Sequence, residues 1–354
     1  METLEPSRLT PAGREAPSRA AGPGRRMARC LGLMLLLTPA VLASPPTGPE
    51  IRMFFGLCDA SAVVPAGRGA FWVGNDEENT LRLYDPAAGP WALEALPLDD
   101  FLEVDREHPE ADIEGAADAG ELVFWITSHG RNKDGKKRPS RRRFFATRWV
   151  EAPDGRGPRR LVPAGKPFKG LLEVLLEDPR YGGFGLREGS RRAPKEAGGL
   201  NIEGLAVAPG GALWIGFRNP IPRGRALIAT LLNPREVTLS GALPRLGEPI
   251  LLDLGGLGVR DLVRDGDHWW ILAGEPDGGD EFRLFRWKGP GARPVPEALP
   301  IPADFSPEAI APMGEGRLLL LSDDGTREID GCRCKDLKDP GQRRFRALWW
   351  KPSD

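Results

Sequence analysis

The sequence predicts an all-β fold, namely a β-propeller of five four-stranded blades, with a sixth, degenerate blade as the competing count. Three observations favour this class. A short motif recurs five times along the chain, sustained helical periodicity is scarce, and Gly and Pro are abundant without a regular period. The chain has 354 residues, of which 45 are Gly and 36 are Pro, so these residues indicate turns between many short strands.

The repeated motif is an apolar run that opens at a small or polar residue and is followed by a second apolar run. In the clearest copy, residues 203–208 predict an inner strand, 209–211 a hairpin turn and 212–217 a second strand. Four copies carry Trp in the second run and the last carries Leu319. Repeats of short strands about 50 residues apart are typical of propellers. The copies open at Asp59, Asp112, Asn201, Gly258 and Ser306.

The last copy provides only three strands, the third being residues 344–350. Residues 50–55 precede the first copy and can supply the missing fourth strand. We therefore expect residues 51–55 to pair with residues 345–350. Such pairing would close the ring and leave no exposed sheet edge between the first and last copies.

An insertion separates the second and third copies, which open 89 residues apart, against 53, 57 and 48 residues elsewhere. Within it, apolar residues at 171, 172, 175 and 176 have helical spacing, and Pro179 follows. We interpret the segment as a short inserted helix with a loop. A degenerate sixth blade is the alternative.

Residues 1–43 are expected to be an N-terminal extension and a secretory signal peptide, with translation starting at Met27. Arg25 and Arg26 precede a 12-residue apolar run at 31–42, which ends at a small-residue cleavage site. This run is too short to span a bilayer, so residues 44–354 are expected to form one secreted or periplasmic domain with no membrane span. A retained N-terminal anchor is the alternative.

The composition also bears on partners and on redox state. The formal net charge is −1, so nothing predicts nucleic acid as a partner, and we expect a monomer. Three cysteines follow the expected cleavage site: Cys58, Cys332 and Cys334. Export predicts one disulfide with a spare thiol, either between Cys58 and one of the other two or between Cys332 and Cys334.

Four segments of the chain resemble a known bacterial family. They are 198–206 (GGLNIEGLA), 215–220 (IGFRNP), 252–262 (LDLGGLGVRDL) and 112–115 (DIEG). Over about residues 50–350 the chain resembles the bacterial family of domains of unknown function numbered 3616. Through its Asp/Asn-x-Glu-Gly motifs it is also distantly similar to propellers with the esterase-like domain associated with phytases. The resemblance implies a fold and leaves the chemistry open.

When the five copies are aligned, one position near the start of each inner strand is polar in every copy. In a propeller these positions face one end of the central channel, where carboxylates and a guanidinium would shift one another's pKa. The alternative is a structural staple, in which each Glu binds backbone N–H groups of its own blade. The position is occupied by Ser61, Glu114, Glu203, Arg260 and Glu308.

A second position lies four residues after the Trp, in the loops that follow the second strands. These loops should lie at the same channel mouth, where several acidic oxygens would suit Ca²⁺, which takes six to eight oxygen ligands. We therefore predict Asp76, Glu77, Asp323 and Asp324 as metal ligands. His129 is a further catalytic candidate, and Arg218 and Asn219 are candidates for substrate binding.

Two function classes follow from these residues. In the first, the protein is a metal-assisted hydrolase of phosphate or carboxylate esters, in which Glu114, Glu203 and Glu308 bind metal or act as base and Arg260 binds a small anionic substrate. In the second, it is a non-catalytic propeller that binds a protein or envelope ligand. The sequence has no Gly-x-Ser-x-Gly motif and gives no support to a serine hydrolase. Residues 131–143 carry eight basic side chains, either a solvated hairpin tip or an attractor of polyanions.

Overall fold

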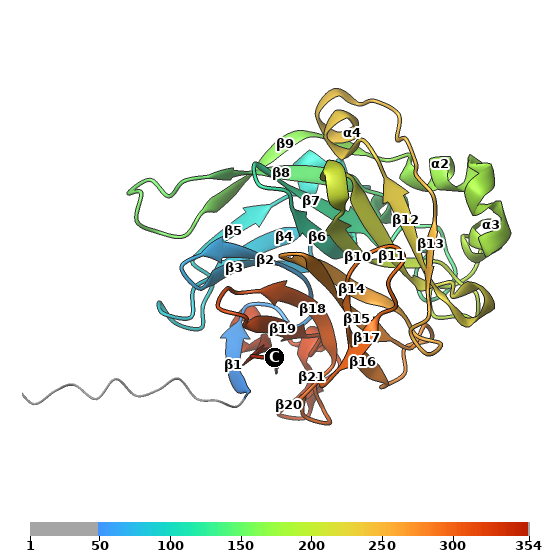
Figure 1. The fold of residues 1–354 in the computed structure, drawn as a ribbon. Helices are drawn as coiled ribbons and strands as arrows, with labels where there is room; N and C mark the ends of the chain where they lie inside the picture. The colour runs from blue at the N-terminus through green and yellow to red at the C-terminus, as the bar shows by residue number, and fades with distance from the viewer. Residues whose placement is uncertain (1–48, 353–354) are drawn as a thin grey trace, which may run out of the picture. The chain divides into compact units, whose positions relative to one another are not determined.

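Five four-stranded antiparallel sheets are arranged as the blades of a propeller in the computed structural model (Figure 1). The structure describes residues 49–352, so the expected extension and signal peptide at 1–43 lie outside the described residues. The predicted fold class is confirmed, and the count of blades is five. The alternative of a sixth blade is wrong, because the insertion after the second blade is mainly helix and loop.

Each blade is built from strands that follow one another in the chain, except the last. Blade 1 contains β2 (Ala60–Gly67), β3 (Ala70–Asn75), β4 (Thr80–Tyr84) and β5 (Glu94–Pro97). Blade 2 contains β6 (Ile113–Asp118), β7 (Leu122–Thr127), β8 (Phe144–Val150) and β9 (Arg160–Phe168). Blade 3 contains β10 (Asn201–Val207), β11 (Leu213–Asn219), β12 (Ala226–Leu231) and β13 (Ile250–Leu252). Blade 4 contains β14 (Gly258–Asp265), β15 (His268–Gly274), β16 (Phe282–Trp287) and β17 (Val295–Glu297).

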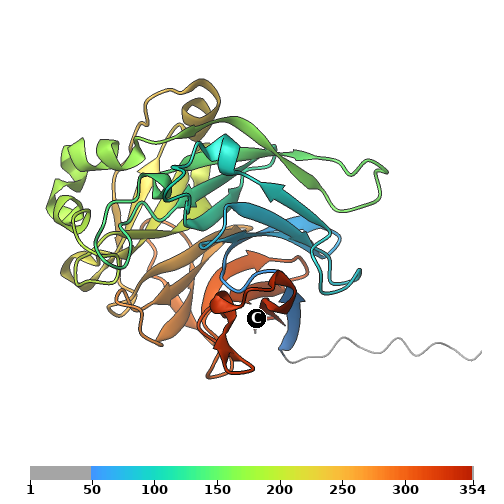
Figure 2. The same ribbon diagram turned by 180° about the vertical axis from the view of Figure 1, so that it is seen from behind.

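Blade 5 closes the ring with strands from the two ends of the described chain. Its order is β18 (Pro307–Pro312), β19 (Leu318–Ser322), β22 (Arg344–Trp350) and β1 (Glu50–Phe55). Ile51 pairs with Leu348 and Phe55 with Arg344, so the expected closure is confirmed. The innermost strands β2, β6, β10, β14 and β18 each contact the next, and β18 contacts β2. Seen from behind, the blue β1 lies beside the red C-terminal part (Figure 2).

Helices cover the outside of blades 2 and 3. The predicted inserted helix is α2 (Leu171–Glu177), and it is followed by η2 (Pro179–Phe184) and α3 (Leu186–Gly189). A further helix that was not predicted, α4 (Pro234–Ser240), lies between β12 and β13 and contacts β9 (Figure 1). A short helix, α1 (Asp99–Leu102), links blades 1 and 2.

Five further 3₁₀ turns and two short strands of the described chain lie in loops. They are η1 (Pro139–Arg141), η3 (Pro209–Gly211), η4 (Pro222–Gly224), β20 (Glu328–Ile329), β21 (Cys332–Arg333), η5 (Cys334–Asp336) and η6 (Pro340–Gln342). The strands β20 and β21 form a small hairpin inserted between β19 and β22. No helix of the described chain is long and apolar enough to cross a bilayer.

The cores lie between blades, where large aromatic side chains of neighbouring sheets meet. Trp214 of blade 3 packs against Trp269 and Trp287 of blade 4, with ring centroids 4.7 and 4.9 Å apart. Trp125 is fully buried and donates a hydrogen bond from Nε1 to the Thr147 hydroxyl at 2.9 Å. These tryptophans therefore hold blade against blade, as contacts of buried aromatic rings do.

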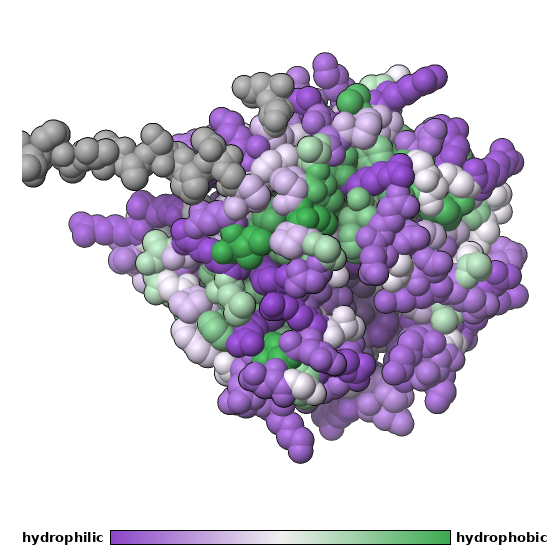
Figure 3. All heavy atoms as spheres, turned by 90° about the horizontal axis from the view of Figure 1, so that it is seen from below, coloured by the Kyte–Doolittle hydropathy of each residue, from purple (hydrophilic) through white to green (hydrophobic). Residues whose placement is uncertain are grey.

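The outer surface is more polar than the interfaces between blades. Figure 3 views the molecule from below Figure 1 and shows a mainly hydrophilic face with a smaller apolar area. Exposed apolar side chains of the described chain include Ile51 and Met53 on β1 and Trp91 ahead of β5. Trp91 stacks on Phe55 with ring centroids 4.8 Å apart, so this part of the surface has local order.

Close packing at the interface of blades 3 and 4 requires glycine. A Cβ on Gly216 would lie 2.5 Å from Cγ1 of Val259, which no side chain can accept without movement. We expect Gly216→Ala to lower the free energy of unfolding by about 1–3 kcal/mol, measured by urea denaturation. Gly182→Ala is the control, because a Cβ there meets nothing within 4 Å. Equal stabilities of the two variants, or no recovery on adding Val259→Ala to Gly216→Ala, would contradict this account.

Candidate functional site

The innermost strand of every blade has a β-bulge near its start, and the bulged residue is the aligned polar position. The register of each inner strand shifts across Ser61, Glu114, Glu203, Arg260 and Glu308. A bulge adds a residue on one strand and redirects its side chain, and bulges are common next to active sites. The same bulge therefore occurs in all five inner strands, although the hydroxyl of Ser61 donates to the Ile113 carbonyl and does not join the charged group described next.

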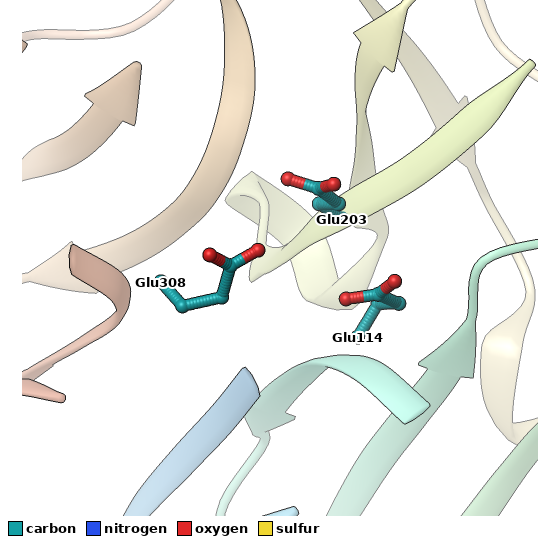
Figure 4. A group of neighbouring side chains, drawn as sticks. All are labelled: Glu114, Glu203 and Glu308. Atoms are coloured by element: carbon teal, nitrogen blue, oxygen red, sulfur yellow. The ribbon is translucent and has the colours of Figure 1, made fainter. Parts of the chain in front are cut away.

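Three of these side chains converge. Carboxylate oxygens of Glu114, Glu203 and Glu308 all lie within 4.8 Å of one another, and the three residues are buried. Figure 4 shows them approaching from separate inner strands, with their carboxylates directed toward a shared space. Glu203 is 2 % exposed. Three carboxylates from three blades thus form a group that could hold a metal ion.

Two arginines neutralise part of this charge. Arg218 donates a hydrogen bond from Nη1 to Oε1 of Glu203 at 2.8 Å, and its Nε donates to the Glu275 carbonyl at 2.9 Å. Arg260 forms an ion pair with Glu308, and its Nε lies 3.9 Å from Oε2 of Glu203. We call Glu114, Glu203, Glu308, Arg218 and Arg260 the central cluster.

Glu114 is the member of the central cluster that lacks a partner. Among residues 49–352 it forms no ion pair with any basic side chain. Burial raises its pKa well above 4.5, and the negative charges of Asp112, Glu203 and Asp76 add to the effect. Oε2 of Glu203 is also buried without a hydrogen-bond partner in the described chain. Buried polar atoms left unpaired indicate a missing ligand, water or ion.

A second acidic group lies where blades 1 and 5 meet. We call Asp59, Asp76 and Asp323 the seam cluster. Asp59 and Asp323 form an isolated antiparallel bridge, which brings the two residues side by side. Burial first, and then Asp323 and Glu77, raise the pKa of Asp59 to about 8.

Asp76 links the two clusters electrostatically. Its Oδ1 is buried without a hydrogen-bond partner within the described chain. Burial raises its pKa well above 3.8, helped by the charges of Asp59, Asp323 and Asp112. The charge of Asp76 also contributes to the raised pKa of Glu114. The charge of Asp323 favours the protonated form of both arginines of the central cluster. Asp76, Arg218 and Asp323 of the second predicted position therefore lie near the charged residues of the first.

Three other candidates have different surroundings. Asp324 accepts hydrogen bonds from Arg346 and from the Ser322 hydroxyl, so its oxygens are used within blade 5. Glu77 is largely exposed and pairs with Lys335, whose Nζ lies 2.9 Å from its Oε1. Asn219 donates to the carbonyls of Pro194 and Glu196, which fixes the insertion against β11. These contacts leave none of the three in the central or the seam cluster.

His129 is buried but lies in a basic environment. Its Nδ1 is 2.7 Å from the Thr127 carbonyl oxygen, and its Nε2 has no hydrogen-bond partner in the described chain. Burial, together with Arg142 and Arg143, lowers its pKa to about 4. The imidazole is therefore neutral at physiological pH, and the charges it feels are arginines rather than the glutamates of the central cluster.

Sequence reasoning missed several residues around the clusters. Asp59, Asp112 and Asn201 open their repeats, two positions before the bulge, and that shared position was the available signal. Nη1 of Arg141 lies 2.7 Å from Oδ2 of Asp112. Burial raises the pKa of Asp112 more than this ion pair lowers it, so the pKa is about 6. Asn201 donates from Nδ2 to Oε1 of Glu203 at 2.6 Å.

A disulfide joins Cys58, ahead of β2, to Cys334, and Cys332 is free. The two cysteines are 276 residues apart in the sequence, so the bond crosses the junction of blades 1 and 5. Cys58 and Cys334 are buried together with Ile329. A disulfide is consistent with an exported protein.

Arg260 should control the protonation of the central cluster. We expect Arg260→Ala to raise the pKa of Glu114 further, because the removed cation favours the charged form of nearby carboxyls. The measurement is a carboxyl ¹³C NMR titration, with Glu114→Gln to assign the resonance. Arg264→Ala, an exposed change on the same strand, is the control. An unchanged or lowered pKa of Glu114 would show that Arg260 does not act on this carboxyl.

The solved structures that are similar to this chain are distant from it in both sequence and structure. A PQQ-bound aldose sugar dehydrogenase from Streptomyces coelicolor shares 14% identity at a TM-score of 0.41, covering 86% of this chain and 99% of that chain. Virginiamycin B lyase from Staphylococcus aureus shares 10% identity at a TM-score of 0.35, covering 85% of this chain and 99% of that chain. A family 43 β-1,3-galactosidase shares 14% identity at a TM-score of 0.44, covering 84% and 91%. No role of a residue follows from likenesses this distant.

The sequence comparison is more specific. No curated protein sequence shows a significant match to this chain. The likeness to the esterase-like domain associated with phytases stays a prediction. A family model, however, matches residues 59–150 and 159–317, which include all of blades 1 to 4 and the inner strand of blade 5. The chain belongs to the family described as Protein of unknown function (DUF3616).

Proposed function

We propose that the protein is an exported, monomeric hydrolase that uses a divalent cation, Ca²⁺ above all, to cleave a phosphate or carboxylate ester at the channel mouth. The observation that carries the proposal is the unpaired carboxyl of Glu114 beside Glu203 and Glu308, with ligand oxygens within 4.8 Å of one another. Oxygens that share one Ca²⁺ at about 2.4 Å can be at most about 4.8 Å apart, so this spacing fits a common ion.

The charge of the central cluster supports an anionic substrate. Three carboxylates and two guanidinium groups give a formal charge of −1, which a divalent cation would change to +1. Arg218 and Arg260 then provide planar donors that match phosphate or carboxylate oxygens. Asp76 and Asp323 of the adjacent seam cluster can supply further oxygen ligands, since Ca²⁺ takes six to eight.

The unpaired Glu114 is suited to proton transfer. Burial and neighbouring negative charge raise its pKa above that of a free carboxyl. A buried carboxyl with a raised pKa is the type of group that acts in general acid–base catalysis. A bound cation would polarise the ester and stabilise developing negative charge. Glu203 is held by Asn201 and Arg218, so its role is that of an oriented ligand.

The test measures cation binding and turnover on the same samples. We expect calorimetry to detect Ca²⁺ binding to the protein and p-nitrophenyl phosphate or acetate to be hydrolysed only when the cation is present. Glu114→Gln should reduce turnover by about 10²-fold or more, in line with loss of a general acid–base group. Glu177→Gln is the matched control, because Glu177 is exposed on α2. Turnover by Glu114→Gln at the level of this control would refute the role of Glu114.

A non-catalytic propeller is the second candidate, and one observation favours it. Arg260 of blade 4 pairs with Glu308 of blade 5 and approaches Glu203 of blade 3, so these charges also tie three blades together. Such a protein would bind a small anion or an envelope protein without turnover. Ca²⁺ binding with no hydrolysis of either ester would favour this function, and no Ca²⁺ binding would reduce the central cluster to a structural staple.

A further inference from the structure

A pocket lies beside blade 2, and the residues that line it are not those of the central cluster. It has a volume of about 580 Å³ and is formed by the segment after α1, the loop between β7 and β8, and the start of α2. None of its lining residues belongs to the central or the seam cluster. Ligand pockets typically have volumes of about 300–1,000 Å³, so this one can take a small molecule.

A buried arginine forms the inner wall of this pocket. Arg143 is 4 % exposed and forms no ion pair with a carboxylate of residues 49–352. Its guanidinium instead donates to the carbonyls of Leu102, Glu103 and Pro139. Carbonyl dipoles hold the group in place but leave its full positive charge uncompensated, and desolvation lowers its pKa.

Two further cations of the pocket are also without counter-charges. Lys137 and Arg138 line the pocket at its solvent side, and neither forms an ion pair within the described part of the chain. Nη1 of Arg138 donates to the Lys137 carbonyl at 3.1 Å, which orders this part of the loop. Together with Arg143 they place three uncompensated positive charges around one hollow.

The carboxylates of the pocket do not neutralise these three cations. Glu173 pairs with Arg142 at 2.6 Å, and Glu103 pairs with Lys169 at 2.5 Å. Asp105 accepts hydrogen bonds from the backbone N–H groups that follow it, so its carboxylate terminates a turn. Five basic and three acidic side chains line the pocket, which leaves it with a formal charge of +2.

We propose that this pocket binds a phosphorylated small molecule through Lys137, Arg138 and Arg143. A phosphate group offers several acceptor oxygens and up to two negative charges, which match the ammonium group of Lys137 and the guanidinium group of Arg138. The donors of Arg143 are mostly occupied by backbone carbonyls, so Arg143 contributes mainly its positive charge. The basic run at residues 131–143 therefore divides in two. Arg141 forms an ion pair with Asp112. Lys137 and Arg138, which precede it, and Arg143, which follows it, form a separate anion site.

The experiment is titration calorimetry with inorganic pyrophosphate in buffer with EDTA, so that no cation in the channel contributes. We expect saturable binding that weakens by at least about tenfold in the variant Lys137→Ala/Arg138→Ala, because charge-assisted hydrogen bonds are lost. The matched control is Lys133→Ala/Lys136→Ala, which removes the same charge from the same loop outside the pocket. Its affinity should change by less than about twofold.

A gain-of-binding variant makes the test independent of folding defects. Glu173→Gln removes the partner of Arg142, adds one uncompensated charge and should tighten pyrophosphate binding by about threefold. Equal losses in the two double variants would overturn the pocket in favour of general attraction by the loop. Sulfate at the same concentration is the second ligand, and binding of sulfate as tight as that of pyrophosphate would overturn the choice of phosphate. The outcome does not depend on any hydrolysis in the channel.

Discussion

The cation-free protein is expected to lose stability as the pH rises from about 5 to about 8, by several kcal/mol in free energy of unfolding. Burial raises the pKa of Asp59 to about 8, and the pKa values of Asp76 and Glu114 are also raised. These carboxyls keep their protons in the folded chain at pH values where the unfolded chain has released them. His129, whose pKa is lowered to about 4, acts in the opposite direction below pH 6.5, but the carboxyls with a raised pKa outnumber it. The folded state therefore binds more protons between pH 5 and pH 8, and stability falls across that window.

Addition of Ca²⁺ should reverse this trend. A cation that replaces the protons on Asp59, Asp76 and Glu114 stabilises the ionised carboxylates, so its stabilising effect should be small at pH 5 and large at pH 8. Urea unfolding at both pH values, with and without Ca²⁺, measures all four free energies. The variant Asp59→Asn/Asp76→Asn should show a flatter pH dependence without the cation. Stability that rises between pH 5 and pH 8 in the cation-free protein would contradict the raised pKa values.

Removal of the disulfide should have the second large effect. Cys58 and Cys334 are 276 residues apart, and for a loop of this length the chain-entropy model gives roughly 5 kcal/mol. We expect Cys58→Ser/Cys334→Ser to lose a large part of this amount in urea unfolding. Wild-type protein treated with dithiothreitol should lose a similar amount.

The control for the disulfide is Cys332→Ser, which removes the free thiol two residues away. It should unfold at the same urea concentration as the wild type. Thiol titration of the denatured protein without residues 1–43 should find one thiol in the wild type and none in this variant. No loss of stability in Cys58→Ser/Cys334→Ser would show that strand pairing alone holds blades 1 and 5 together.

The convergence of the three glutamates could be predicted from the sequence, because structural repeats place aligned residues at the same position in each blade. Alignment of the copies was therefore enough to bring Glu114, Glu203 and Glu308 together before any coordinates. The bulge that directs each of them was not foreseen, because one extra residue in a strand leaves the apolar pattern almost unchanged.

Other features depend on contacts that no local pattern encodes. The pairing of Arg218 with Glu203 joins two strands of one blade, and that of Arg141 with Asp112 depends on how a long loop folds back. The helix α4 has seven residues, too few to show a helical period, although Pro234 and Gly241 at its ends were usable signals. The choice between Cys332 and Cys334 required knowing that Cys334 is buried beside Cys58.

The pairing of β1 with β22 has a consequence for folding kinetics. These strands lie almost 300 residues apart, so blade 5 cannot be completed until both β1 and β22 have been made. Contacts of such high sequence separation form late and slowly, because the entropy of closing the loop must be overcome first.

Until then, the hydrogen-bonding edges of β1 and β22 are open, and such edges can pair with other chains. A chain that crosses a membrane before folding would pass through this stage on the far side. The chain would remain open to aggregation and proteolysis until β22 pairs with β1.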